Sequence, residues 1–526
     1  METLTAARED ILNTLKELKE GQKFDFLMDI CGVDYPGRDG GRFDVVYHLY
    51  SSSANMRLRV KTRVPENDPV VPSVTSLWKA ANWFERECFD LFGIKFSGHP
   101  NLKRILLYEG FEGHPLRKDY PINKRQVIPT SVDLRPSGED GHFWVNFGPS
   151  HPATHGAFRL MLKLDGERIV EAIPEIGYLH RCFEKESEDH TYTQVIPYTD
   201  RLNYCSPLMN NVGYCKAVED LMGIDIPERA KYIRVLVAEL SRIIDHLVAI
   251  GTNVVDMGAL TNYWYTFNIR EYVYDWIERL CGARLTTTYT RIGGVARDIP
   301  ADSKKYLKGV LKRLDRAVKD VTGLLVKNRI FLDRTRGIGA ISAGDAISYG
   351  YTGPCLRAAG VAYDVRKASP YYHYDEFDWD VPIGERGDTY DRIMVRFEEM
   401  RQSARIVQQV LEKMPDGPIM VENHEVALPP KARVYNSIEG LMNQFKLIME
   451  GIRPPAGEIY SYTEAANGEL GFYIVSDGGV RPYRIKVRPP CYAIYQAYPE
   501  LIRGHMIADA VAVMGSLNVI AGELDR

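Results

Sequence analysis

Residues 228–257 carry apolar side chains at the i, i+3 and i+4 spacing of an α-helix, and these side chains lie on most of its sides. A helix of this kind is expected to be central and buried. The best candidate for a bilayer span, residues 233–257, carries ionisable side chains along its length, which excludes a bilayer-spanning helix. They include Arg234, Glu239, Arg242, Asp245 and His246. The chain is therefore expected not to span a membrane, so any membrane role must come through partners.

Helical spacing recurs around this segment, at residues 178–190, 203–221, 262–282, 302–325, 389–414 and 499–515. Strand-like segments stand before and after the helices, at residues 142–147, 157–165, 168–174, 458–475 and 483–487, with turns at 165–167 and 476–479. Residues 142–526 are thus predicted to form a large, mainly α domain with small antiparallel β pieces.

Residues 1–125 have a different pattern. A helix is expected at 4–18, two strands at 43–50 and 56–61 around a hairpin turn at 51–55, and a helix at 74–92. The polar stretch 126–141 contains proline and glycine and is predicted to be a linker. The fold class is therefore α+β, with a small N-terminal α+β domain at 1–125, a linker, and the large domain at 142–526.

The net charge is −4, which gives no sign of the basic face that nucleic-acid binding requires. The charged N-terminus has no apolar stretch of the kind found in a secretory signal. The eight cysteines are scattered, and none stands in a C-x-x-C pair. A disulfide framework is not expected in such a chain. We also expect no metal held by this chain alone, since nickel and iron–sulfur sites need several converging thiolates.

His151 and His155 stand in a short loop, FGPSHPATHG at residues 147–156, between two predicted strands. Two histidines four residues apart on a helix could chelate a metal. A helix is disfavoured here by Pro149, Pro152 and Gly156. The functional interpretation is that an imidazole of this loop hydrogen-bonds a ligand. The alternative interpretation is that both histidines only pack the loop.

Three further residues have two interpretations each. Tyr204, at a helix start after Asp200 and Arg201, could offer its phenol to a carbonyl or could simply pack. Asp256 lies near the end of the long helix and is either a buried carboxylate with a partner or a surface acid. Arg181 is either a surface ion pair or a cation beside a redox centre.

Several motifs of the N-terminal domain occur together. They are WFERECFDLFGI at residues 83–94, GHPNL at 98–102 and PLRKDYP at 115–121. With them, most of residues 1–125 resembles the C-type subunit of proton-pumping NADH:quinone oxidoreductase, the bacterial respiratory complex I.

The second domain resembles the D-type subunit of the same complex almost end to end. The motifs in family order are GPSHPATHG at 148–156, GYLHR at 177–181, FEK at 183–185, RIGG at 291–294, RGD at 386–388, SDGG at 476–479, GHM at 504–506 and GELDR at 522–526. The resemblance therefore implies a C-type unit fused to a D-type unit.

The D-type subunit is similar to the large subunit of nickel–iron hydrogenases, which holds its metal with two C-x-x-C pairs. Here Cys205 and Cys491 stand alone near the two expected positions. The resemblance implies that the vacated cavity binds a quinone headgroup.

By the same resemblance, His155 and Tyr204 would hydrogen-bond the two ends of the quinone and donate its protons, with His151 in the same loop. Asp256 would interact with His155 and link quinone chemistry to conformational change. Arg181 would lie beside the terminal iron–sulfur cluster, which a small partner subunit holds. The N-terminal domain would brace the peripheral arm.

Three residues depart from the family pattern. Cys182 stands where the family usually has glycine, and Asn203 replaces the usual aspartate before the tyrosine. Thr286 stands where many members have a histidine that takes up a proton when the cluster is reduced. Because threonine cannot do so, we hypothesise a low-potential cluster suited to a quinone such as menaquinone.

The expected function is quinone reduction, with ubiquinone or menaquinone as substrate, in a peripheral subunit on the cytoplasmic side of the bacterial inner membrane. The expected partners are the small iron–sulfur subunit, other iron–sulfur and flavin subunits, and a membrane subunit at the quinone entrance. Two alternatives remain: a related complex fed by ferredoxin or a deazaflavin, and a structural scaffold without an active site.

Overall fold

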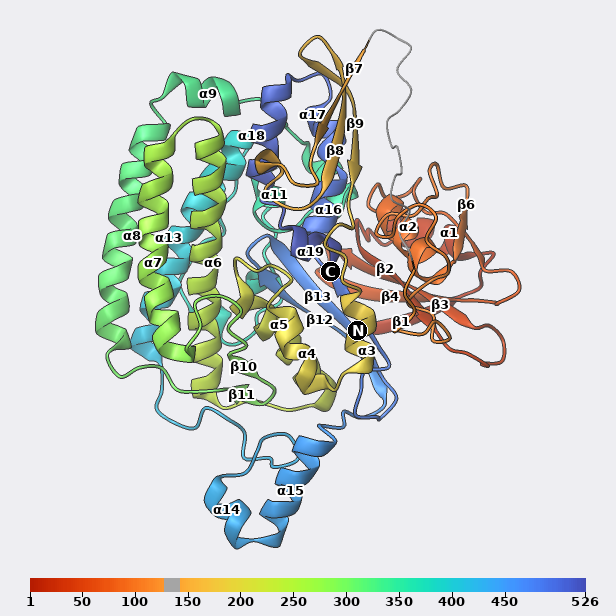
Figure 1. The fold of residues 1–526 in the computed structure, drawn as a ribbon, viewed down its shortest axis with the longest axis vertical. Coiled ribbons are helices and arrows are strands. Elements are labelled where there is room, and N and C mark those ends of the chain that lie inside the picture. The colour runs from red at the N-terminus through yellow and green to blue at the C-terminus, as the bar shows by residue number, and fades with distance from the viewer. Residues whose placement is uncertain (127–141) are drawn as a thin grey trace.

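The computed structural model describes residues 1–126 and 142–526. Apart from Gln126, the predicted linker lies outside the described residues. Figure 1 shows a β-rich N-terminal part beside a larger part that is dominated by long helices. The mixed α+β character expected from the sequence is confirmed.

The N-terminal part is built on a four-stranded sheet in the order β1-β4-β3-β2. Its strands are β1 (Glu2–Ala6), β2 (Phe26–Asp34), β3 (Phe43–Ser51) and β4 (Met56–Val64). The hairpin of β3 and β4 is the predicted one and is antiparallel, as is the pairing of β2 with β3. Helix α2 (Ala81–Phe92) packs on β2. Two short strands, β5 (Val70–Pro72) and β6 (Lys95–Ser97), pair in parallel.

The helix predicted at 4–18 is wrong at its start. Residues Glu2–Ala6 form the edge strand β1, which pairs in parallel with β4, and α1 spans only Ile11–Glu20. Pairing with a sheet edge satisfies the backbone groups of this segment, and tertiary contact of this kind overrides a local helical pattern. The helix predicted at 74–92 likewise begins only at Ala81.

The long helix of the sequence analysis is α6 (Glu228–Asp256), and it packs against both α7 (Leu260–Cys281) and α13 (Thr389–Lys413) in the group of long helices in Figure 1. Helix α8 (Ser303–Leu325) covers the outer side of α7. The charges inside α6 are paired, for example Arg234 with Glu219 at 2.6 Å. A central, buried helix is what the apolar pattern predicted, and the pairing of its charges is shown by the structure.

Two antiparallel sheets complete the second part. They are β7 (Phe143–Phe147), β8 (Arg159–Asp165) and β9 (Arg168–Glu175), and β12 (Gly457–Ala465), β13 (Gly468–Ser476) and β14 (Arg484–Arg488). The single strand predicted at 458–475 is a hairpin, because the chain turns at 466–467 and Gly468 has φ +136°. The second sheet faces the N-terminal sheet across a shared apolar cluster.

The last predicted helix, 499–515, is broken into α17 (Tyr498–Ile502) and α18 (Ile507–Leu517). Gly504 has φ +79°, and its N–H donates to the carbonyl of Ile169 in β9 at 2.8 Å. A left-handed glycine paired with a strand ends the helix. A final short helix, α19 (Ala521–Asp525), follows.

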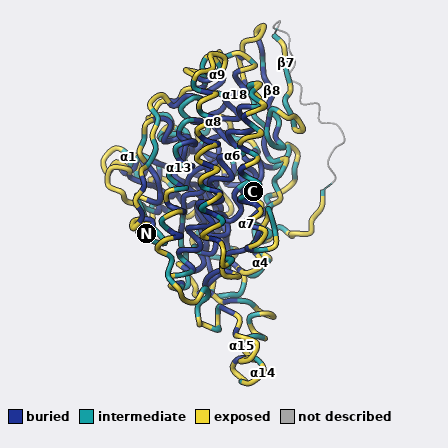
Figure 2. The backbone as a smooth tube through the Cα atoms, turned by 90° about the vertical axis from the view of Figure 1, so that its left-hand side faces the viewer, coloured by how far each residue is buried: buried dark blue, intermediate teal, exposed yellow. Residues whose placement is uncertain are grey.

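The remaining elements are shorter. They are α3 (Phe183–Asp189), α4 (Tyr192–Thr199), α5 (Pro207–Met222), β10 (Thr290–Arg291), β11 (Gly294–Val295), α9 (Arg329–Thr335), α10 (Ala343–Ser348), α11 (Gly353–Ala358), α12 (Val365–Ala368), α14 (Lys431–Asn436), α15 (Ile438–Met449) and α16 (Pro490–Gln496). Single 3-10 turns lie at Pro152–Thr154 and Tyr374–Glu376. Helices α14 and α15 project from the body and are largely exposed (Figures 1 and 2). Within residues 1–126 and 142–526, no helix is long and apolar enough to cross a membrane.

Candidate quinone site

The histidine loop joins β7 to β8 and contains one turn of 3-10 helix, not an α-helix. His151 begins this turn, and its Nδ1 accepts a hydrogen bond from the Ala153 N–H at 3.2 Å. The ring also packs edge-on against Phe147, with 4.9 Å between ring centroids. His151 therefore stabilises the loop while the residue remains exposed.

His155 contacts Asp256, the last residue of α6. The distance from His155 Nε2 to Asp256 Oδ2 is 2.6 Å, and the side chains are 20% and 19% exposed. His155 has φ +57°, in the left-handed region, which turns the chain at the end of the 3-10 turn. The carboxylate only accepts hydrogen bonds, so the imidazole Nε2–H donates to it. The structure thus gives Asp256 a partner.

Tyr204 lies in the turn before α5 and is 36% exposed. Partial burial raises the pKa of its phenol to about 12, against the opposing effect of the Arg181 guanidinium. The phenol therefore keeps its proton at neutral pH and can donate it.

The start of α19 brings the two segments together. A Cβ on Gly156 would lie 2.8 Å from the Ala521 Cβ, and a Cβ on Gly522 would lie 3.2 Å from the Tyr204 ring. The loop of His155 and the turn of Tyr204 therefore contact consecutive residues. Glycine at 156 and 522 permits this close approach.

A buried polar cluster lies beneath Tyr204. The Asn203 amide and the Asn518 amide donate to opposite oxygens of Asp245, at 2.9 and 2.7 Å. An aspartate at 203, which the family usually has, would face the Asp245 carboxylate in a fully buried place. Like charges there would force one carboxyl to keep its proton. Asn203 thus fits this chain's own cluster.

The two lone cysteines also border this cluster. Burial raises the pKa of Cys205 and of Cys491, so both thiols stay protonated. The Cys491 sulfur accepts from the Asn467 amide and the Ile520 N–H, each at 3.5 Å. Amides and single thiols here do not match the four thiolates of a nickel–iron centre.

Arg181 lies on the exposed side of the Tyr204 turn. Its Nη2 donates to the Arg201 carbonyl at 2.9 Å, and partial burial together with the Arg201 guanidinium lowers the pKa of Arg181. Thr286 is exposed in a nearby loop. In this loop the Thr288 N–H donates a hydrogen bond to the Asp200 carboxylate at 3.0 Å. The surface beside the site is therefore cationic.

Cys182 follows Arg181 and has φ +54°. This left-handed conformation favours glycine, the residue that the family usually has there. A cysteine in this place is strained by roughly 1 kcal/mol. No other feature of the structure explains the substitution.

The N-terminal part is joined to this region by buried ion pairs. Glu87 accepts from Arg526 at 2.9 Å and also pairs with Lys486. Within the second part, Glu184 accepts from Arg484 at 2.7 Å and lies 3.9 Å from Arg526, beside this contact. Motifs from both ends of the chain, WFERECFDLFGI and GELDR, thus meet through Glu87 and Arg526.

Two family models match the chain. The respiratory-chain NADH dehydrogenase 30 Kd subunit matches residues 4–126, and the 49 Kd subunit matches residues 256–526. The C/D-type subunit of NADH-quinone oxidoreductase from Bdellovibrio bacteriovorus is 53% identical over 534 aligned residues, covering 100% of this chain and 95% of the relative. The chain belongs to the family of fused C/D-type subunits of NADH-quinone oxidoreductase.

Two further relatives, one of the C/D type and one of the D type, support the same assignment. The C/D-type relative from Ectopseudomonas mendocina is 42% identical, and the match covers 100% of this chain and 93% of the relative. The D-type relative from Myxococcus xanthus is 53% identical, and the match covers 73% of this chain and 92% of the relative. The chain is thus a fusion of two complex I subunits in the peripheral arm, and other subunits of the complex are its partners.

For this fused chain, the structure brings most of the sequence-predicted residues into one region. His155 contacts Asp256, Tyr204 shares their neighbour α19, and Arg181 lies close to Tyr204. His151 instead caps its own loop. The sequence analysis gave no site role to Asp245, a charge of the long helix, or to Glu523, a residue of the GELDR motif, although both lie beside the lone cysteines. Only the long-range contacts of the folded chain place these two carboxylates beside the cysteines.

Proposed function

We propose that this chain forms the quinone-reduction site of the enzyme, next to the terminal iron–sulfur cluster of a partner subunit. The observation that carries the proposal is the contact of His155 with Asp256 beside Tyr204, a phenol that keeps its proton. The substrate is a quinone, ubiquinone or menaquinone, and this chain alone holds no redox cofactor.

The two donors match the two carbonyl oxygens of a quinone headgroup. The Tyr204 O–H donates to one carbonyl. Because His155 Nε2 is occupied by Asp256, the Nδ1 atom is left for the other carbonyl. Reduction to quinol takes two electrons and two protons, and these two side chains serve as general acids.

Asp256 is the positioning residue of this pair. Its carboxylate fixes the imidazole and stabilises a positive charge on it when His155 carries a second proton. After His155 gives up that proton, the contact weakens. Since Asp256 ends α6, quinone reduction is thereby linked to movement at the end of that helix.

The electrons enter from the side of Arg181. Its guanidinium and that of Arg201 form an exposed cationic surface that suits the small iron–sulfur subunit. A cation next to a cluster stabilises the added electron and tunes the potential. Cys182 and Thr286 lie on or near this surface. Both departures from the family pattern therefore change the surroundings of the iron–sulfur cluster.

The other partners follow from this arrangement. Further iron–sulfur and flavin subunits deliver electrons. A membrane subunit lies at the entrance through which the quinone reaches the site, and membrane subunits couple its reduction to ion pumping. The chain lies peripherally on the cytoplasmic side of the bacterial inner membrane. The large domain, which resembles the hydrogenase large subunit, carries the site, and the domain at 1–125 braces it. The exposed apolar side chains of α15 suit contact with a further subunit.

The test is Tyr204→Phe in membranes that carry the assembled complex. The substitution removes one hydroxyl, and NADH:quinone activity is expected to fall roughly 10²-fold. NADH:ferricyanide activity reports electron input and is expected to persist. Tyr435→Phe, at a side chain 83% exposed on α14, is the matched control.

One outcome counts against the proposed site, and another counts only against the electron donor. If Tyr204→Phe keeps full quinone activity, the tyrosine only packs and the scaffold interpretation gains weight. If the membranes reduce quinone with reduced ferredoxin or deazaflavin but not with NADH, the quinone site stands and the electron donor is wrong.

A further inference from the structure

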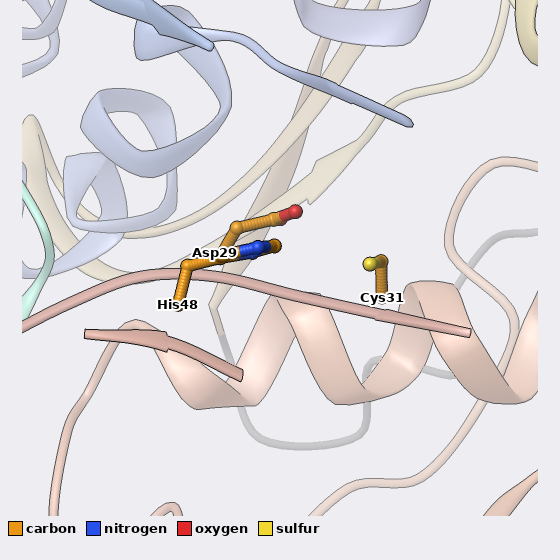
Figure 3. Close-up of side chains that lie close together, drawn as sticks. All are labelled: Asp29, Cys31 and His48. Carbon is orange, nitrogen blue, oxygen red and sulfur yellow. The ribbon is translucent and has the colours of Figure 1, made fainter. Parts of the chain in front are cut away.

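Asp29, Cys31 and His48 form a cluster in the N-terminal part, away from the quinone site (Figure 3). Asp29 and Cys31 stand two residues apart on β2 and therefore share one face of the sheet. His48 on β3 is the direct cross-strand partner of Asp29. In Figure 3 the three side chains rise from the same face, and the cysteine sulfur points toward the other two.

Their ligand atoms lie close together and are out of solvent. One atom from each residue lies within 4.8 Å of the other two, and the residues are 0%, 2% and 1% exposed. Both carboxylate oxygens of Asp29 and both ring nitrogens of His48 lack a hydrogen-bond partner. Unsatisfied buried polar atoms gathered at one place are costly and call for a ligand.

The cations near Asp29 are held by other carboxylates. Lys486 Nζ lies 3.8 Å from Asp29, beyond hydrogen-bond distance, and pairs with Glu87 instead. Arg57 pairs with Glu469 at 2.7 Å, and Arg59 and Lys61 pair with Glu458. Asp29 thus has an ammonium group 3.8 Å away but accepts no hydrogen bond from it, and a bound cation would give the carboxylate a direct partner.

We propose that Asp29, Cys31 and His48 bind a divalent transition-metal ion of the zinc class. Sulfur, imidazole nitrogen and carboxylate oxygen are the ligands that zinc takes in proteins. In tetrahedral coordination with bonds of this length, the ligand atoms lie roughly 3.5 Å apart. Side-chain rotations that shorten the distances between these atoms by about 1 Å therefore suffice. Binding replaces the thiol proton of Cys31 with the metal–sulfur bond and releases that proton.

The surroundings favour a structural role for this metal. The His48 ring stacks on Tyr460 of β12 at 4.3 Å and meets Tyr473 of β13 edge-on at 5.0 Å. The ion would fix the β2–β3 face of the N-terminal part against the β12–β13 hairpin of the second part.

The test is metal binding by the purified full chain. After chelator treatment, the protein is titrated with Zn²⁺ against a chromophoric competitor, and with Co²⁺, whose bond to a thiolate gives near-ultraviolet charge-transfer absorption. The wild type is expected to bind one equivalent, with the sulfur band and a rise in Tm. Cys31→Ser and His48→Gln are expected to weaken binding at least tenfold.

Cys88→Ser is the matched control, since Cys88 is an equally buried thiol that donates to the Ile30 carbonyl and lies outside the cluster. It is expected to bind like the wild type. Asp29→Asn keeps the side-chain shape and serves where the other variants fail to fold. Absence of stoichiometric binding, a missing sulfur band, or equal loss in the control overturns the proposal.

Discussion

Two charged contacts of similar length lie in very different surroundings. Glu87 and Arg526 are 2.9 Å apart at the contact between the N-terminal and second parts, with side chains 4% and 2% exposed. His155 and Asp256 are 2.6 Å apart in the candidate quinone site, with side chains one fifth exposed. The first pair is sealed among other charges, and the second is open to solvent.

The difference in burial changes what each contact does. A sealed ion pair must stay paired, because a lone buried charge is very costly, so it fixes how the two parts fit. An open pair contributes little to stability because water screens it. It can exchange protons, which is what a reduction site requires. Four predictions test this contrast.

The largest expected effect is that of Glu87→Ala. The change leaves Arg526 and Lys486 buried without their shared carboxylate, and such losses cost about 3–5 kcal/mol. Urea unfolding of the full chain measures the cost. Glu450→Ala, which removes a surface pair with Arg453, is the control and is expected to cost less than about 1 kcal/mol. Equal losses would remove the contrast.

The second prediction concerns acid pH. Burial alone would raise the pKa of Glu184, but Arg484 and Lys486 hold the pKa below its ordinary 4.5. A lowered folded pKa gives stability that is present above 4.5 and is lost as pH falls further, by at most about 1.4 kcal/mol per pH unit. Urea midpoints at descending pH measure this slope. Glu184→Gln is expected to flatten it, and an unchanged slope would count against a sealed network.

The third prediction is for Asp256→Asn, which removes the charge and keeps the shape. Stability is expected to change by less than about 1 kcal/mol, while quinone reduction falls roughly 10²-fold. Urea unfolding and NADH:quinone assays measure the two effects, and Asp315→Asn, at an exposed position of α8, is the control. A stability loss like that of Glu87→Ala would show that the pair is structural.

The smallest expected effect is that of Thr286→His. An exposed imidazole near the cationic surface can take up a proton when the cluster is reduced, so the cluster midpoint should become dependent on pH. The dependence should stay below about 59 mV per pH unit, the limit for one proton per electron. Redox titration of the assembled complex measures it. If the unmodified complex already shows this dependence, the hypothesis of a low-potential, menaquinone-type cluster fails.

Regular elements with strong local patterns were predictable. The hairpin of β3 and β4, the strands β8 and β9, and the helix α6 all follow from side-chain periodicity, which reports which face is buried. Errors arose where a distant partner decided the conformation. Residues 2–6 became a strand because β4 offers an edge, and the last helix broke because Gly504 pairs with β9.

The candidate site was predictable only in part. The non-helical histidine loop followed from its prolines, but spacing could not tell whether His155 or Tyr204 had more than a packing role. Asp256 was as consistent with a surface acid as with a buried one. The contact with His155 decides between these two interpretations, and it joins residues 101 positions apart. The choice of asparagine at 203 likewise makes sense only beside Asp245.

The amino-acid sequence was sufficient for the class of fold, the central position of α6 and, through its motifs, the family. The fold class and the position of α6 follow from short-range periodicity, and the family follows from short sequence motifs. The pairing of His155 with Asp256, the sealed charges around Glu87 and the cluster of Asp29, Cys31 and His48 were decided by the tertiary structure. Each depends on the distance and burial of side chains that only the folded chain brings together, and no local pattern encodes them.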